Sequence, residues 1–506
     1  MTSYPADGIS RRAVLVAFAA GAGAAGLSAI LAPVATGADP LAGRPSRVPG
    51  GPLTVASWRA SRSRQLYVAH RGSGDVLPEH SMEAYQAAFD WGATCMEVSV
   101  AITSDGVLIC MHDDTYDRTT TGRGEIVAQP SSVLADIRIW QPQLGEAWTE
   151  NPPKVPLFED VLRTFGAKVI LCVEAKVPAA YEPMMSLVEK YGLRDSVIVK
   201  GSYNNTQLYR AQTAGYPIFS YFGTAGDVTL DAINQLGARL HPERDILVIA
   251  GIASAPSFIS DELVKAAVAT GVPVWVHPLH RRSDAAHFFA LGVDGAICAS
   301  YGYIAGATTS VKADSWAARR IAPGEITKSP ASQSYAPTFT ADGQLVLDAK
   351  GTQHFVTLGQ FGPLPAAAAS YTIDADVSWL GEPDADTDNV TLAFGHEDDR
   401  YYEHRQGDGT GYHLILRRNG ELGFYLHKDG VSDGVLLAPS VSTKAPAIGK
   451  WAHLRVEVSP DRIVASRTDV AGATVTATDS TVRGGYLHIG RSSLNGSAAF
   501  RALAVS

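Results

Sequence analysis

Two short parts of the chain carry side chains that could do acid–base chemistry on a phosphate. His70-Arg71-Gly72 ends one apolar run, Glu79-His80 follows it closely, and His112 ends a second apolar run. The imidazole pKa lies near neutral pH, so a histidine can take up or release a proton there. An arginine guanidinium presents a planar fork of donors that suits phosphate oxygens. These residue types predict a site that holds a phosphate with a fixed cation and moves protons with imidazoles.

The predicted elements bring these residues to one edge of a sheet. Residues 97–102 alternate between polar and apolar, which predicts a strand that turns Glu97 and Ser99 to one face. Asp105-Gly106 predicts a tight turn, and the returning apolar run ends at His112. We therefore expect the second imidazole to come back to the end of the first strand and to share its pocket.

The order of these residues resembles the glycerophosphodiester phosphodiesterase family. The resemblance also rests on Glu174-Ala175-Lys176, and it covers about residues 65–305. Pro78-Glu79-His80 is similar to the form found in periplasmic members of that family. The resemblance implies a phosphoric diester hydrolase built on a barrel, with its catalytic groups at the carboxyl ends of the strands.

The resemblance also implies a role for individual residues. His70 and His112 would be the catalytic acid and base, and Arg71 and Lys176 would clamp the phosphate. Trp275 would line the substrate wall, with plain core packing as the alternative. The attacking oxygen is either the substrate's own glycerol hydroxyl, which gives a cyclic phosphate, or water. The sequence leaves both routes open.

A divalent metal, Ca²⁺ or Mg²⁺, is the cofactor that the resemblance implies, with Glu97 and Glu174 as oxygen ligands. The family usually carries Glu-x-Asp on the second strand, whereas Ser99 stands at the third position here. A neutral hydroxyl in place of a carboxylate predicts a weak metal site. Glu79 or water would fill the gap, or the metal would be dispensable.

Composition and charge limit the classes of function. The chain has 506 residues, 46% hydrophobic and 18% charged, which suits two or three globular domains. A formal net charge of -9 and a pI near 5.9 argue against non-specific binding of nucleic acid. The cysteines fall in predicted barrel strands without metal-binding spacing, so we expect buried thiols, with disulfides as the alternative. They are Cys95, Cys110, Cys172 and Cys298.

The amino-terminal segment predicts export. Arg11-Arg12 precedes an apolar stretch rich in alanine and glycine over residues 13–35, and Thr36-Gly37-Ala38 offers small residues for cleavage. This pattern is typical of a twin-arginine signal peptide over residues 1–38. A membrane anchor is the alternative, but the glycines make a poor spanning helix. We expect a secreted protein without a stable membrane anchor.

The rest of the chain divides into two predicted domains. Residues 39–64 and 311–334 are predicted linkers, and β-rich runs alternate with helical patterns over residues 65–310, which predicts a TIM (β/α)₈ barrel. Short alternating strands recur over residues 335–506, with Asn419-Gly420 as a hairpin turn. They predict an all-β jelly-roll sandwich similar to concanavalin-like or laminin-G-like modules, which often hold polysaccharide.

These observations favour a secreted phosphodiesterase. Its substrates would be small glycerophosphodiesters or phosphodiester-linked wall polymers such as teichoic acid, with cell-wall polysaccharide as a possible partner of the β-domain. Two alternatives stay open: a glycosidase-like barrel that uses Glu97 and Glu174 as its carboxylate pair, and a non-catalytic protein that binds wall polysaccharide.

Overall fold

The computed structural model describes residues 52–60, 65–254, 257–308, 310–326, 337–351, 354–361, 370–400, 409–431 and 433–506. The predicted twin-arginine signal, most of the first predicted linker and the end of the second lie outside these ranges. Within them, no helix combines the length and the apolar character needed to cross a membrane.

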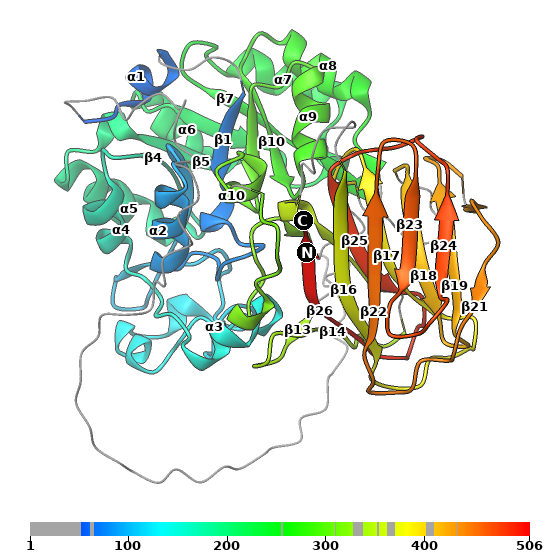
Figure 1. Ribbon diagram of the computed structural model, residues 1–506. Helices are drawn as coiled ribbons and strands as arrows, with labels where there is room; N and C mark the ends of the chain where they lie inside the picture. Colours follow the sequence, from blue (N-terminus) through cyan, green and yellow to red (C-terminus); the bar gives the residue numbers. More distant parts are fainter. Residues whose placement is uncertain are drawn as a thin grey trace, which may run out of the picture. The chain divides into compact units, whose positions relative to one another are not determined.

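Eight parallel strands close into a barrel, as predicted (Figure 1). β1 closes it by pairing with β11 on one side and β2 on the other. A ninth strand, β3 (Leu108–Cys110), returns antiparallel to β2 and forms the expected hairpin. The parallel strands are β1 (Leu66–Ala69), β2 (Cys95–Ile102), β4 (Ile170–Ala175), β5 (Val197–Ser202), β6 (Ile218–Tyr221), β7 (Ile246–Ala250), β10 (Val274–Leu279) and β11 (Gly295–Cys298).

Helices cover the outside of the barrel because each presents an apolar stripe to the strands. In α4 (Phe158–Phe165), the buried residues recur at helical spacing and the charged residues face away. The other covering helices are α2 (Met82–Asp90), α5 (Pro178–Lys190), α6 (Thr206–Thr213), α7 (Leu230–Arg239), α8 (Asp261–Ala269) and α9 (Arg282–Ala290), and a short helix, α10 (Tyr301–Ile304), follows β11.

A separate apolar cluster fills the amino-terminal end of the barrel. The short helix α1 (Val55–Ala60) contributes Trp58, whose ring lies edge-on to Trp275 at a centroid distance of 6.0 Å. Trp275 stands at the start of β10 and is 1% exposed, so it packs in the core, far along its strand from the carboxyl end. The prediction that Trp275 contacts substrate is wrong, because the same aromatic type serves the core equally well.

The four cysteines are buried free thiols, as expected. Cys95 and Cys172 lie on neighbouring strands with their sulfur atoms 3.4 Å apart.

The carboxyl-terminal half forms two antiparallel sheets that share one apolar core. Asn419-Gly420 makes the predicted hairpin between β18 and β19. One sheet contains β12 (Glu325–Ile326), β15 (His354–Leu358), β25 (Tyr486–Arg491), β17 (Asn389–His396), β18 (Gly411–Arg417), β19 (Glu421–His427), β20 (Val435–Leu436) and β21 (Val441–Ser442). The other contains β13 (Thr338–Phe339), β14 (Leu345–Leu347), β26 (Ala498–Val505), β16 (Tyr371–Trp379), β22 (Ala452–Val458), β23 (Ile463–Arg467) and β24 (Thr474–Ala477).

Residues 310–326 belong to this β-sandwich, which corrects the first part of the predicted linker. Trp316 is fully buried and donates its indole hydrogen bond to Glu325 at 2.8 Å. Ala313 pairs with Ala504 of β26. The polar composition of the segment hid this one large apolar anchor, and a single tryptophan leaves no periodic pattern in a sequence.

Four buried histidines form a row across adjacent strands of the first sheet. They are His488 of β25, His396 of β17, His413 of β18 and His427 of β19. Neighbouring rings lie 4.3 Å, 5.6 Å and 4.2 Å apart between centroids. We call these side chains the histidine row.

The barrel and the sandwich form one compact unit among the described residues. The long segment after His112 leaves the barrel rim, and its short helix α3 (Glu146–Glu150) reaches the sandwich. There the Ala147 amide donates to the Arg319 carbonyl at 3.0 Å, and the Glu146 carboxylate accepts from the Phe339 amide at 3.1 Å.

A second contact joins Asp399 of the sandwich to the barrel. Its carboxylate accepts from the backbone amides of Arg282 and Ser283, at 2.7 and 2.9 Å, at the start of α9. It also accepts from the Tyr303 hydroxyl at 2.7 Å. Asp399 therefore ties the helices that follow the last two barrel strands to the sandwich.

Candidate active site

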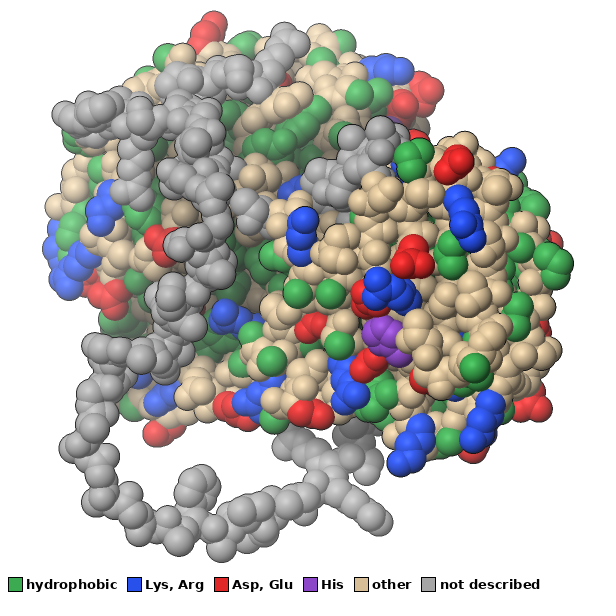
Figure 2. Space-filling model, viewed as in Figure 1, with side chains coloured by type: hydrophobic (Ala, Val, Ile, Leu, Met, Phe, Trp, Pro, Cys, Tyr) green, Lys and Arg blue, Asp and Glu red, His purple; other side chains and the backbone are tan. Residues whose placement is uncertain are grey.

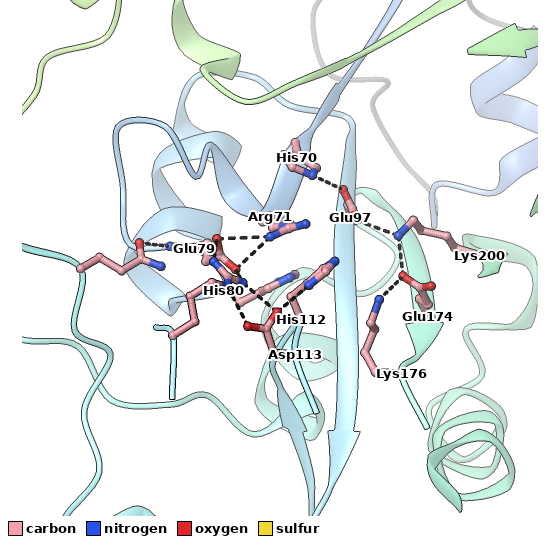
Figure 3. Close-up of polar contacts among 12 residues, drawn as sticks. His70, Arg71, Glu79, His80, Glu97, His112, Asp113, Glu174, Lys176 and Lys200 are labelled. Carbon is pink, nitrogen blue, oxygen red and sulfur yellow. Dashed lines mark hydrogen bonds and ion pairs between the residues drawn. The ribbon is translucent and has the colours of Figure 1, made fainter. Parts of the chain in front are cut away.

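The chain turns sharply where β1 ends, and this turn presents His70 and Arg71. Arg71, Gly72 and Ser73 all have positive φ, at 52°, 77° and 85°. A Cβ atom on Gly72 would lie 2.8 Å from Cβ of Ala84 in α2, so only glycine fits this close approach. Figure 3 shows the result, with His70 pointing toward Glu97 and Arg71 toward the neighbouring Glu79.

His70 lies against the buried carboxylate of Glu97 on β2. Its Nε2 atom is 3.6 Å from Glu97 Oε2. Burial lowers the pKa of His70 well below the usual 6.5, although the Glu97 charge acts in the opposite direction. Burial outweighs the carboxylate, so the imidazole of His70 is neutral near pH 7.

The register of the sheet brings Glu174 of β4 beside β2, with Ser99 opposite Glu174. Lys200, from the end of β5, lies between the two carboxylates (Figure 3). Burial would raise the pKa of Glu174, but the Lys200 and Lys176 ammonium groups outweigh it and lower that pKa to about 2. Glu174 is therefore ionised at neutral pH.

His112 stands at the end of the β3 hairpin and is oriented by its neighbour Asp113. Its Nδ1 lies 2.8 Å from Asp113 Oδ1. Because an ionised carboxylate only accepts, Nδ1 carries the proton and the lone pair is on Nε2. Burial lowers the pKa of His112, the Asp113 bond raises it, and the Arg71 and Lys176 cations lower it further, with a net fall below 6.5. His112 is thus a neutral base near pH 7.

Arg71 and Arg118 both hold the carboxylate of Glu79. Arg71 Nη1 donates to its two oxygens at 3.1 and 3.3 Å, and Arg118 donates to them at 2.7 and 3.1 Å. Arg118 also donates to Asp113 at 2.6 Å. A chain of ion pairs therefore runs from Arg71 to the carboxylate that orients His112.

The arrangement does not fit the expected divalent ion. Glu79 is paired with two guanidinium groups and does not join Glu97 and Glu174, which corrects its predicted role as a metal ligand. Ser99 is buried and offers no charge, and the Lys200 ammonium contacts both carboxylates. In the described part of the chain, no group of three histidine, cysteine, aspartate or glutamate side chains is arranged to hold a metal ion.

Apart from Trp275 and Glu79, the predicted site residues lie close together at one end of the barrel. The shared site contains His70, Arg71, Glu97, His112, Glu174 and Lys176. The sequence reasoning missed Lys200, Asp113 and Arg118. Asp113 directly follows His112, and Lys200 is a charged residue that ends an apolar strand, so each had a local signal. Arg118 lies in an irregular segment and had none.

The barrel is similar in sequence to known proteins. A family model described as the glycerophosphoryl diester phosphodiesterase family matches residues 70–299. A glycerophosphodiester phosphodiesterase of Caldanaerobacter subterraneus is 26% identical over 246 residues, which cover 46% of this chain and 93% of that protein. One of Bacillus subtilis is 35% identical over 148 residues, covering 26% of this chain and 48% of the relative. A solved glycerophosphodiester phosphodiesterase structure from Agrobacterium tumefaciens covers 48% of this chain and 99% of its own, with 20% identity and a TM-score of 0.39. The family match falls on the barrel alone.

Proposed function

We propose that His70 and His112 catalyse the hydrolysis of a phosphodiester on this barrel, which carries a glycerophosphodiester phosphodiesterase family domain and makes the chain a phosphoric diester hydrolase. The observation that carries this proposal is the layering of the site. The side chains of His70, Arg71, His112 and Lys176 are 15%, 18%, 28% and 15% exposed. The carboxylates beneath them are 3% and 6% exposed, so an arriving phosphate meets two imidazoles and two cations.

The proton steps follow from the hydrogen bonds. His112 Nε2 takes a proton from the attacking oxygen, which then forms a bond to phosphorus while Asp113 holds the imidazolium. The bond from phosphorus to the leaving oxygen breaks, and that oxygen takes a proton that His70 has bound from solvent before the step. Burial opposes this charged form of His70, and the Glu97 carboxylate, 3.6 Å from its Nε2, favours it. Arg71 and Lys176 offset the charge on the non-bridging oxygens.

A glycosidase mechanism is not supported by the same geometry. Glu97 and Glu174 would have to act as free acid and base. Both are buried and paired with Lys200, so neither carboxylate is available to a sugar.

We propose two substrate classes, namely small glycerophosphodiesters and phosphodiester-linked wall polymers such as teichoic acid. The polymer is supported by the second domain, because its sequence resembles modules that often hold polysaccharide. The direct test incubates the protein with glycerophosphocholine and, separately, with purified wall teichoic acid, and follows the release of glycerol phosphate by ³¹P NMR. A folded protein that cleaves neither compound would contradict the proposal, and His112→Ala controls for contaminating enzymes.

We also propose export through the twin-arginine pathway, supported by Arg11-Arg12 and the apolar stretch that follows. Replacing both arginines with lysine should retain the protein inside the producing cell. Fractionation followed by an immunoblot measures this, and unchanged secretion would remove the proposal.

Binding to insoluble cell wall, measured by co-sedimentation, tests the polysaccharide partner.

A further inference from the structure

Every carboxylate oxygen of Glu97 and Glu174 already has a partner. Glu97 Oε1 lies 2.9 Å from Lys200 Nζ, and its Oε2 faces His70 Nε2 at 3.6 Å. Glu174 Oε1 accepts a hydrogen bond from the Tyr221 hydroxyl at 2.7 Å, and its Oε2 contacts Lys200. A divalent ion would need these same oxygens within about 2.0–2.6 Å, so it would have to displace the lysine.

The charges of this group already balance. Glu97 and Glu174 supply two negative charges, and Lys176 and Lys200 supply two positive charges. Ser99, where the family usually has an aspartate, adds none. A divalent ion that displaced the Lys200 ammonium would leave one uncompensated positive charge in a nearly dry layer, which is unfavourable.

Lys200 is held firmly in this place. It projects from β5, and its Nζ lies 4.6 Å from the centre of the Tyr221 ring, which is a cation–π distance. A carboxylate stands on each side of the ammonium group, and the side chain is 9% exposed. The ammonium is therefore built into the sheet and does not reach solvent freely.

We propose that Lys200 is the resident cation of the site and takes the place of the divalent metal on which enzymes of this family commonly depend. The inference rests on the proposed phosphodiesterase activity. Lys200 acts as a positioning residue, because it fixes Glu97 with one oxygen toward His70 and leaves Arg71 and Lys176 to bind the phosphate. Hydrolysis therefore proceeds without added metal.

The first experiment uses the unmodified protein. After dialysis against EDTA, its hydrolysis of glycerophosphocholine should change by less than about twofold when calcium or magnesium is added to about 10 mM. Calorimetric titration with calcium alone should detect no binding tighter than about 1 mM. This second measurement does not depend on activity.

The second experiment exchanges the cation. Lys200→Met should lower kcat/KM by about a hundredfold, and Lys200→Arg, which keeps the charge, should retain more activity. Combining Lys200→Met with Ser99→Asp restores the family's charge pattern, so this double variant should gain calcium binding and regain activity only when calcium is present. Lys190→Met, which removes an exposed lysine of α5, is the matched control and should behave like the parent.

The outcomes separate the two proposals. Activity of the parent that disappears on chelation and returns with calcium would overturn the role of Lys200, and so would tight calcium binding by the parent. If the parent cleaves no diester and only the double variant binds calcium, Lys200 is still the resident cation in place of a metal ion. In that case the proposed phosphodiesterase function fails. If Lys200→Met does not fold, chelation and calorimetric titration of the parent protein still test whether its activity depends on a metal ion.

Discussion

The charged side chains of the site form two layers with different tasks. The outer one, with both imidazoles, Arg71 and Lys176, is open enough to meet a substrate. The inner one, with Glu97, Glu174 and Lys200, is nearly dry and keeps the outer side chains in place. This division predicts that changes in the outer layer reduce activity, whereas changes in the inner layer also reduce stability.

Removing either imidazole should reduce turnover and leave the fold intact. We expect His70→Ala and His112→Ala each to lower kcat by about a hundredfold or more, because general acid or base catalysis contributes on that scale. Steady-state hydrolysis of glycerophosphocholine measures the loss, and circular dichroism checks the fold. Near-normal turnover by either folded variant would contradict a mechanism that divides the proton transfers between them.

The pH profile should depend on Lys176. The acid limb of kcat/KM reports protonation of the base, and burial and nearby cations hold the pKa of His112 below 6.5. A cation disfavours the protonated imidazole, so Lys176→Met should raise this pKa and move the acid limb to higher pH. The shape of the profile is the readout, because the variant also loses a phosphate contact. Lys168→Met, outside the site, is the control and should leave the acid limb of the profile at the same pH. If Lys176→Met leaves the acid limb unmoved as well, Lys176 does not lower the pKa of His112.

Much of this site was predictable because each histidine follows an apolar strand and carries charged neighbours. The strand ends placed His70 and His112 at one edge, and the family resemblance added Arg71, Glu97, Glu174 and Lys176. Lys200 was missed for a physical reason. Its role comes from the two carboxylates on either side of it, and that neighbourhood exists only after three separated strands have paired.

The turn after β1 decides where the first imidazole and the guanidinium point. Gly72→Ala should destabilise the protein by about 2–4 kcal/mol, since it adds a methyl group at a positive φ and against Ala84. Gly106→Ala is the matched control. Gly106 also has positive φ but open space around it, so it should cost only about 1 kcal/mol. Urea unfolding compares the two, and equal losses would mean that the close approach to α2 has no cost.

Strands and helices were more predictable than the segments between them. The alternation of β and helical patterns gave all eight barrel strands, and Asn419-Gly420 gave a hairpin of the sandwich. The prediction of a linker over residues 311–334 is wrong for residues 311–326, which belong to the sandwich. Those residues join the sandwich through the buried Trp316 and through a single bridge from Ala313 to Ala504, far along the chain. Neither contact leaves a periodic pattern in the sequence.

The two halves of the molecule support each other through Asp399. Asp399→Ala removes three hydrogen bonds and leaves the start of α9 and the Tyr303 hydroxyl without their acceptor, so we expect a loss of about 2–4 kcal/mol. Asp398→Ala is the control, because Asp398 forms an ion pair with the partly exposed Arg400 of the same segment. Thermal unfolding followed by calorimetry measures the difference. If both variants melt alike, Asp399 does not connect the barrel to the sandwich.

The histidine row gives the sandwich a limited tolerance of acid. Burial lowers the pKa of His396 well below 6.5 and that of His488 to about 3. The unfolded chain therefore binds more protons than the folded one below about pH 6.5, and stability falls as the pH falls toward 3. The His396 and His488 rings lie on adjacent strands with their centroids 4.3 Å apart, so a proton on one ring further disfavours a proton on the other. Acid elution and acidic storage buffers therefore cost this half of the protein stability, and a purification scheme for it belongs at neutral pH or above.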